Sequence, residues 1–327
     1  MAGYLGRRLL LSAATMLLIT AGVYAAIRLA PGIPGPDDET ARAAPGGWID
    51  AYHIQDSIPV GYARWIADLA RLDFGRSLGV APGRPVADLV ESALPYTLLL
   101  GSMGFALTWM VALPLGILGA WIPRSPGARV SAALLFCLHA LPAFWIALAL
   151  QQVVAGRLGA LPAVGPGPLE ARAGMTGLMA CVPYWVLPTV ALTTGSLAFV
   201  IRFCRSVLLE AASHEYVATA RAKGAGPARV LCRHALGASA VPLVSLTGLM
   251  LPGILSGSVV IETIFGLPGI GRLLFRAAGQ RDYPVIMAVS LMAAAATVGA
   301  HLLTDLIAGA ADPRFKAASG GGREGLP

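Results

Sequence analysis

Charged residues are scarce in this chain. Only 13% of its 327 residues are Asp, Glu, Lys or Arg, whereas about a quarter of the residues in a soluble domain are charged. Hydrophobic residues make up 56% of the chain, and its mean hydropathy is +0.71. This composition excludes an ordinary soluble domain and indicates an integral membrane protein.

Lysine is rarer still, because Lys223 and Lys316 are the only two. The phosphate-binding loop of nucleotide hydrolases needs a Lys that is followed by Ser or Thr. Gly224 and Ala317 stand at those positions instead, so the chain lacks an ATP site of this type. We expect it to bind no cofactor and no nucleic acid itself.

The four cysteines indicate neither a disulfide framework nor a metal site. Cys137-x-His139 and Cys232-x-His234 have the spacing of a ligand pair, but one falls in an apolar stretch and the other in a polar loop. Each pair is explained as a small apolar residue beside an unrelated His. His301 could be the base of an intramembrane hydrolase, but the serine motif G-x-S-G is absent. We predict no catalytic residue and no metal ligand.

Acidic residues are missing from the middle of the apolar stretches. Glu262 and Asp305 lie towards the ends of such stretches, whereas proton-coupled carriers usually place Asp, Glu or His near the membrane midplane. This absence argues against a stand-alone secondary carrier. The carrier and the intramembrane hydrolase stay open as alternative functions.

Six apolar stretches are long enough, at about 20 residues each, to cross a hydrocarbon core roughly 30 Å thick. They lie near 9–29, 97–122, 130–154, 178–201, 239–261 and 285–311. The first could be a secretory signal, but its charge-free run from Leu9 to Ile27 exceeds the usual signal core of about 7–15 residues. The sequence therefore predicts an all-α membrane protein with six transmembrane helices.

Composition divides the chain into four parts. These are an N-terminal transmembrane helix (1–30), a periplasmic segment (31–95), a five-helix core (96–316) with a cytoplasmic loop (202–238), and a disordered tail (317–327). Within the periplasmic segment, the Pro- and Gly-rich residues 31–47 are expected to form a flexible connector.

The stretch 57–72 of the periplasmic segment is typical of an amphipathic helix. Its apolar side chains recur at helical spacing, namely Tyr62, Trp65, Ile66 and Leu69. Such a helix either lies on the outer face of the membrane or fills a gap between spans.

The charge distribution predicts the orientation of the chain. Placing both termini and the loops 123–129 and 202–238 on one side, with Asp305 counted there, gathers 13 Lys and Arg against 5 Asp and Glu. The other side then holds 11 against 12. Because positively charged loops face the cytoplasm, we expect cytoplasmic N- and C-termini.

A polar, basic block, Glu215–Leu236, stands between two of the apolar stretches. Ser213 is placed to cap a helix whose first turn carries Glu215, and Gly224 is placed to end it. Small and basic residues between these signals would let another protein approach closely and offer it charge, namely Ala218, Ala220, Arg221, Ala222 and Lys223. The alternative is a basic loop held near anionic lipid headgroups.

The spacing of this block resembles the EAA loop, E-A-A-x-x-x-G-x9-I-x-L-P, of permease subunits in bacterial ABC importers. Ala220, Gly224 and Leu236 match that pattern, whereas Ala218 and Gly237 stand in place of Glu and Pro. The letters T-A-R-A-K-G followed by R-H-A-L are similar to the dipeptide/oligopeptide, or peptide/nickel, branch of the family.

Further segments resemble the same branch in order and spacing. They are Tyr4–Leu10, Asp73–Leu78, Glu262–Leu274, Arg281–Pro284 and Asp312–Arg314. Because they extend along almost the whole chain, it is identified as a member of this family, which implies the fold of a type I ABC importer permease.

The resemblance also implies partners and contact residues. The chain would form half of a translocation pathway for di- or oligopeptides in the bacterial inner membrane. Its partners would be a second homologous permease subunit, two ABC ATPase subunits that carry ATP-Mg, a periplasmic or lipid-anchored solute-binding protein, and membrane lipid. The ATPase would contact Glu215, Tyr216, Ala220, Arg221, Lys223, Gly224 and Ala225. The binding protein would touch the 57–72 helix and the residues Phe265, Pro268 and Gly269.

Pro252, Gly253 and Gly257 interrupt the apolar stretch that follows the basic block. Broken backbone at membrane depth is tolerated where it faces protein or a water-filled cavity. We therefore expect these three residues to line the pathway, although packing through small residues would explain them equally well. The sequence leaves the solute open between a dipeptide, an oligopeptide, a nickel chelate and other small molecules.

Overall fold

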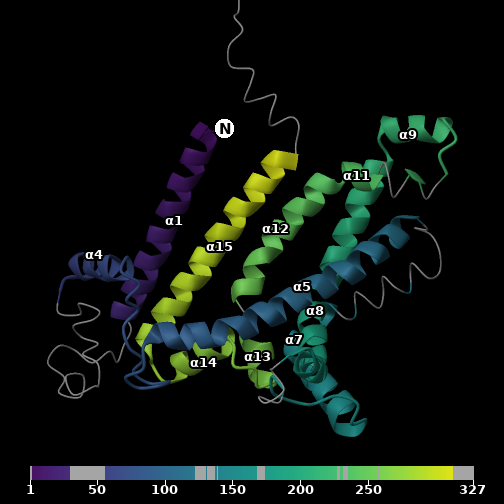
Figure 1. The fold of residues 1–327 in the computed structure, drawn as a ribbon. Helices are drawn as coiled ribbons and strands as arrows, with labels where there is room; N and C mark the ends of the chain where they lie inside the picture. Colours follow the sequence, from purple (N-terminus) through teal and green to yellow (C-terminus); the bar gives the residue numbers. More distant parts are fainter. Residues whose placement is uncertain are drawn as a thin grey trace, which may run out of the picture. The chain divides into compact units, whose positions relative to one another are not determined.

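The computed structural model describes residues 2–29, 56–121, 139–167, 174–226, 235–256 and 258–311, together with Val130, Cys137, Arg229 and Val230. These residues are helical or irregular, and the only extended pairing among them is an isolated antiparallel bridge between Arg76 and Pro85. The all-α prediction is confirmed (Figure 1). The predicted connector 31–47 and tail 317–327 lie outside the described residues.

The long helices are α1 (Ala2–Leu29), α5 (Val86–Trp121), α8 (Gly174–Ala212), α12 (Ala240–Ser256) and α15 (Tyr283–Ala311). Shorter elements connect them, namely α4 (Ile58–Leu69), α7 (Ala143–Leu150), the π-helix η1 (Gln151–Arg157), α9 (Glu215–Ala222), α11 (Leu236–Ala238), α13 (Val259–Ile264) and α14 (Ile270–Gly279).

Four helices of the described chain are long and apolar enough to span a membrane: Leu10–Leu29, Val86–Trp121, Cys181–Ala212 and Tyr283–Thr304. They coincide with four of the six predicted stretches. The other two stretches are not single helices. In the first of them, Pro142 adopts an extended conformation with ψ 137°, and α7 begins only at Ala143.

The remaining stretch, 239–261, is also interrupted. Helix α12 ends at Ser256, and α13 begins at Val259. The backbone N–H of Ile261 donates to Ser258 Oγ over 3.3 Å, so Ser258 caps the new helix. A continuous span over 239–261 was therefore a wrong prediction, because a capping serine starts a second helix inside it.

The chain forms two compact units. Unit 1 comprises Met1–Leu98, Leu255–Thr263 and Leu267–Leu302. Unit 2 comprises Leu99–Ile254, Ile264–Gly266 and Leu303–Pro327.

The core of unit 1 joins the start of α5 to α14 and α15. Its buried side chains are Val86, Leu89, Ala93, Ile270, Leu273, Ala277, Val285, Ala288 and Val289. Apolar residues recur on one face of the ten-residue helix α14, and this face packs into the core while Phe275 and Arg276 stay exposed on the other. This end of unit 1 is thus a packed structure.

Helix α4 packs against α1 within unit 1. Trp65 is buried together with Tyr24 of α1 and Met287 of α15, and Tyr62, Ile66 and Leu69 pack around them. The Tyr62 hydroxyl lies 2.8 Å from Thr20 Oγ1. The apolar face of α4 is therefore directed into the protein, as expected for a helix that fills a gap, and its polar face carries the exposed Arg64.

Unit 2 is held together by small residues on α5. A Cβ at Gly104 would lie 2.9 Å from the Leu192 side chain, and one at Gly116 would lie 2.6 Å from Cys204 Cβ. The Arg205 side chain of α8 donates to the Gly119 carbonyl over 3.1 Å. Close approach through such residues is how helices associate in membranes.

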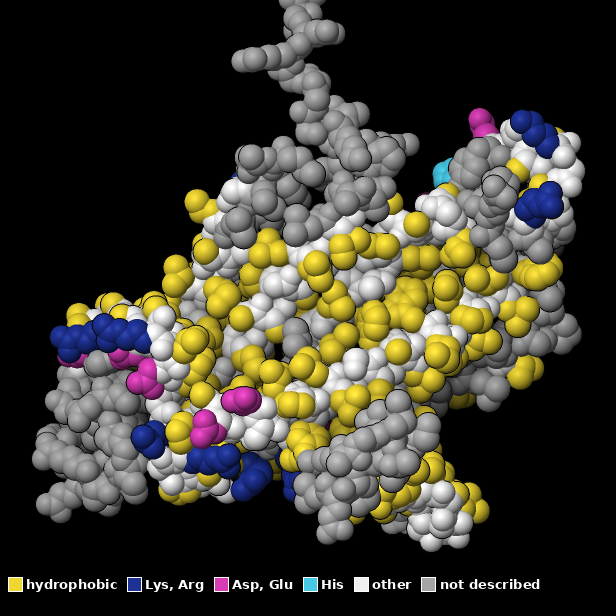
Figure 2. All heavy atoms as spheres, viewed as in Figure 1, with side chains coloured by type: hydrophobic (Ala, Val, Ile, Leu, Met, Phe, Trp, Pro, Cys, Tyr) yellow, Lys and Arg dark blue, Asp and Glu magenta, His cyan; other side chains and the backbone are white. Residues whose placement is uncertain are grey.

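Hydrophobic side chains cover the exposed sides of the long helices, whereas charged side chains gather at α4, at α9, and at α14 and the start of α5 (Figure 2). Leu18 of α1, Met110 of α5 and Leu249 of α12 are large, apolar and exposed. Exposed apolar surface of this extent marks contact with lipid or with other proteins.

Candidate functional site

Helix α9 begins and ends close to the predicted positions. Gly224 has φ +84°, the left-handed conformation that glycine adopts without strain. The Ala225 N–H then donates to the Ala220 carbonyl over 3.1 Å, which is the closing bond of a Schellman motif. The role of Gly224 as the helix terminator is confirmed.

The side chain predicted to cap α9 forms a hydrogen bond with the end of α8. Ser213 Oγ donates to the Glu210 carbonyl over 2.7 Å and so closes the last turn of α8. The first turn of α9 is instead closed by Val217 N–H, which donates to the His214 carbonyl over 3.0 Å. A serine directly after a helix can donate its hydroxyl to a backbone carbonyl in the last turn of that helix.

The predicted coupling residues lie on a small surface element. Val217 is fully buried and anchors α9, whereas Glu215, Lys223 and Gly224 are exposed. Ala220 and Ala225 are half-buried. The side chains of Tyr216 and Arg221 lie outside the described residues, although both belong to the helix. Basic side chains gather at α9 in Figure 2.

Three residues of the segment Glu262–Leu274 form a tightly bonded corner in unit 1, namely Glu262, Ile270 and Arg272. The buried Glu262 carboxylate accepts hydrogen bonds from Thr97 Oγ1 and from the Arg272 N–H, each 2.9 Å long. Thr97 Oγ1 in turn accepts the Ile270 N–H over 2.8 Å. Burial raises the pKa of the Glu262 carboxyl above its ordinary value, and the hydrogen bonds from Arg272 and Thr97 oppose that rise.

This corner explains the glycine in Leu267-Pro268-Gly269. A Cβ at Gly269 would lie 2.5 Å from the Glu262 carboxylate. Gly269 and Phe265 are both buried, and only Pro268 of the three expected contact residues is exposed. Burial gives Phe265 and Gly269 structural roles in the chain and leaves Pro268 available to a partner.

Two motifs that lie 205 positions apart in the sequence meet in unit 1. The buried Asp282 carboxylate accepts Ser77 Oγ over 2.5 Å, Gly79 N–H over 3.0 Å and Val80 N–H over 2.9 Å. Its other oxygen accepts the Leu78 N–H over 3.2 Å. Sequence analysis singled out both motifs but did not pair them. The aspartate holds the loop before α5 against the start of α15.

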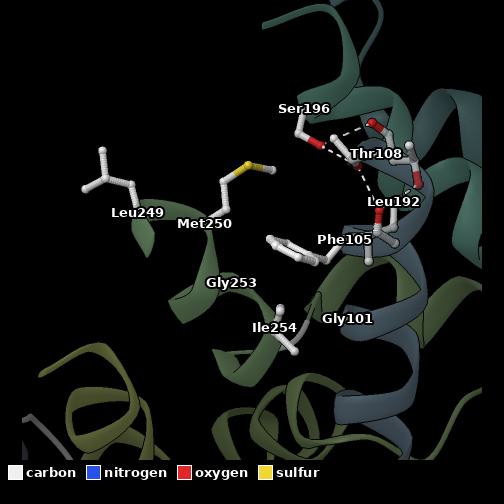
Figure 3. Close-up of a pocket in the computed structure, with 11 residues that line it drawn as sticks. Gly101, Phe105, Thr108, Leu192, Ser196, Leu249, Met250, Gly253 and Ile254 are labelled. Carbon is white, nitrogen blue, oxygen red and sulfur yellow. Dashed lines mark hydrogen bonds between the residues drawn. The ribbon is translucent and has the colours of Figure 1, made fainter. Parts of the chain in front are cut away.

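A cavity of about 290 Å³ lies in unit 2 between α5, α8 and α12. Figure 3 shows Phe105 and Met250 pointing into it from opposite walls, with Thr108 and Ser196 at one end. Gly253 lines this cavity, whereas Pro252 is half-buried and is not part of the lining. Gly257 lies outside the described residues. The structure thus places one of the three expected pathway residues at a cavity.

A profile of the family of binding-protein-dependent transport system inner membrane components matches residues 112–317, more than half of the chain. The chain belongs to this family. Its members are the permease components of ABC importers, so this chain is a transport subunit and ATP hydrolysis belongs to a separate subunit. This membership decides against the intramembrane hydrolase and the stand-alone carrier.

Full-length relatives of this permease support the same assignment. The oligopeptide transport system permease protein AppB of Bacillus subtilis (strain 168) is 34% identical over 322 residues, which cover 97% of this chain and 100% of AppB. The dipeptide permease DppB of the same organism is 32% identical, with 97% and 98% covered. The oligopeptide permease OppB of Escherichia coli (strain K12) is 30% identical, with 95% and 98% covered.

A solved structure shares the fold of this permease. The inward-facing MetNI methionine ABC transporter superimposes with a TM-score of 0.55 at 18% identity, covering 68% of this chain and 96% of that chain. The type I importer permease fold is therefore confirmed. Among the described residues, no group of three or more His, Cys, Asp or Glu could hold a metal ion.

Proposed function

We propose that this permease imports di- or oligopeptides and works with a second permease, two ATPases and a solute-binding protein. The observation that carries the proposal is the similarity to AppB, a permease named for oligopeptide transport, over nearly the entire length of both chains. DppB and OppB, named for dipeptide and oligopeptide transport, support the same class of solute.

Helix α9 is the proposed contact with the ATPase. The buried Val217 ties it to the rest of unit 2, while Glu215 and Lys223 are exposed to a partner. Closure of the ATPases would therefore be transmitted through α9 to α8, as alternating access requires.

The outer end of unit 1 is the proposed contact with the binding protein. The polar face of α4 carries Arg64, and Arg71 is exposed just after the helix. Pro268, Phe275 and Arg276 are exposed at or near α14. Exposed arginine and aromatic side chains are enriched where proteins bind one another. The membrane location is bacterial and inner, with cytoplasmic termini, because the basic loops then face the cytoplasm.

Reconstitution tests the proposal. The permease alone in nanodiscs should hydrolyse no ATP, because the ATPase is a separate subunit. After assembly with a second permease and two ATPases, ATP hydrolysis should rise when a peptide-loaded binding protein is added, because that protein stabilises the state in which the ATPases close. In liposomes the same complex should accumulate labelled peptide only with ATP. Uptake by the permease alone, driven by an ion gradient, would contradict the proposal.

A further inference from the structure

We infer that the cavity between α5, α8 and α12 is a solute subsite of this chain, and that it takes an uncharged, N–H-donating stretch of peptide. The inference rests on the proposed peptide transport and adds to it a selectivity within the permease. The lining consists of Gly101, Gly104, Phe105, Thr108, Leu192, Thr193, Ser196, Leu249, Met250, Gly253 and Ile254. None of these eleven residues is charged.

Three hydroxyl groups supply the polar chemistry of the cavity. Thr108 Oγ1 donates to the Gly104 carbonyl over 2.8 Å, and Thr193 Oγ1 donates to the Thr189 carbonyl over 2.7 Å. Ser196 Oγ lies 3.3 Å from the Thr193 carbonyl and 3.3 Å from Thr108 Oγ1. Their hydrogen atoms are directed to protein oxygens, so these groups offer chiefly lone pairs to a solute.

Because these hydroxyl groups offer lone pairs and their hydrogens are already engaged, they determine which polar group of a solute can bind. An amide N–H or an amino group can donate to Thr108 and Ser196 (Figure 3). A carboxylate only accepts hydrogen bonds, and the lining side chains offer it neither an N–H donor nor a cationic partner in place of water. An Arg or Lys side chain would likewise find no acidic partner in the lining. The cavity therefore favours neutral segments of a peptide.

The remaining walls suit varied apolar side chains. Phe105, Leu192 and Ile254 provide fixed apolar surface, and Met250 can adapt its shape because its side chain is unbranched and polarisable. A volume of about 290 Å³ stands at the lower end of the range for small-molecule pockets, roughly 300–1,000 Å³. The cavity thus holds a short part of a peptide, and a longer peptide would pass through it in steps.

Gly253 is a suitable position for a cysteine reporter in this cavity. No atom lies within 4 Å of a Cβ at this position, so a cysteine fits there. Gly101 is unsuitable, because its Cβ would lie 2.6 Å from the Ile254 carbonyl oxygen. Gly195 of α8 is the matched control, since it is equally open but does not line the cavity.

The experiment uses the full complex in nanodiscs, with the native cysteines replaced and either Gly253→Cys or Gly195→Cys introduced. We expect the end-capped dipeptide N-acetyl-alanyl-alanine amide in excess to slow maleimide labelling of the cysteine at 253 about tenfold, while the dipeptides of aspartate and of lysine with the same caps leave the rate unchanged. Labelling at 195 should not respond to any of the peptides. Adding Thr108→Val or Ser196→Ala should weaken the protection about fivefold, the change expected for one neutral hydrogen bond.

The outcomes separate this inference from the proposed function. Equal labelling at 253 with and without capped alanyl-alanine, in a complex that still transports peptide, overturns the subsite and leaves peptide transport intact. Protection by the capped aspartate dipeptide as strong as that by capped alanyl-alanine overturns the selectivity. A complex that takes up no peptide of any kind, with normal labelling at 195, overturns the proposed function and the subsite together.

Discussion

At the scale of single residues, one carboxylate organises the loop before α5 in unit 1. Asp282 receives a hydroxyl and three consecutive backbone N–H groups from the loop that begins at Ser77. Ser77 Oγ also accepts the Ala81 N–H over 2.9 Å, which closes the loop on itself. Without Asp282 these donors would lie partly buried and without acceptors.

This arrangement predicts a graded loss of stability. Asp282→Ala leaves several donors unsatisfied, and each costs about 1–3 kcal/mol when buried. Asp282→Asn keeps one acceptor oxygen, so it should lose less. Thermal unfolding of the purified permease, followed by size-exclusion chromatography, should rank wild type above Asp282→Asn and Asp282→Ala last.

The matched control for this series is Glu91→Gln, an exposed carboxylate of α5. It should unfold at the wild-type temperature, since surface substitutions change stability by about 0.5 kcal/mol or less. Asp282→Ala as stable as wild type would show that the loop is held by its apolar contacts instead.

Residue-scale contacts of this kind could not be predicted from the sequence. Both motifs were recognisable as segments, but nothing in the order of residues pairs Ser77 with Asp282. The same holds for Thr97 and Glu262, which are joined only after α5 and α13 have packed. Polar partners distant in sequence are set by tertiary packing, on which local patterns carry no information.

At the scale of elements, the sequence predicts the end of a helix well where the backbone conformation requires one particular residue type. Gly224 ends α9 as predicted, because only a left-handed residue completes the turn there. Apolar runs predicted less well whether a helix continues without a break. Pro142 and Ser258 interrupt two of these runs. A run of apolar residues indicates burial in the membrane, but it does not determine where a helix begins or ends.

Helix α9 supports a prediction at this scale. Ala220→Trp adds bulk at a half-buried position on the proposed contact with the ATPase. Overpacking a tight contact costs typically about 1–3 kcal/mol, which corresponds to roughly a 5- to 150-fold weaker docking equilibrium. ATP hydrolysis by the complex should then lose its response to the loaded binding protein, while the amount of inserted permease stays at the wild-type level.

Ala106→Trp is the matched control for this prediction. Ala106 is an exposed position on the apolar helix α5, where bulk is accommodated outside the protein. A complex that carries Ala106→Trp should respond to the binding protein normally. If Ala220→Trp behaved in the same way, α9 would not be the contact that transmits closure.

At the scale of the whole molecule, composition and charge were enough to predict the class of protein without knowledge of any contact. Scarce charge and long apolar runs indicated a membrane protein, and four spanning helices among the described residues confirm it. The resemblance of separated motifs indicated the family, which the match over residues 112–317 confirms. The proposed solute subsite could not be found from the sequence, because the lining of the cavity comes from three helices that are distant in sequence.

The orientation of the molecule in the membrane is a prediction that rests on the charges of its loops. The side that carries α9 gathers 13 Lys and Arg against 5 Asp and Glu, whereas the side that carries α4 holds 11 against 12. Because basic loops stay in the cytoplasm, α9 should be inside and α4 outside. Ala222 of α9 and Ala67 of α4 are both exposed alanines, which makes them a matched pair for cysteine reporters.

In intact cells, with the native cysteines replaced, Ala67→Cys should react with a membrane-impermeant maleimide. Ala222→Cys should react only after the cells are opened. Both variants should keep peptide uptake, since neither changes charge and each adds a single sulfur at the surface. Labelling of Ala222→Cys from outside, with uptake intact, would place α9 on the side of the binding protein, where no ATPase could reach it, and would remove the physical basis for coupling through this helix.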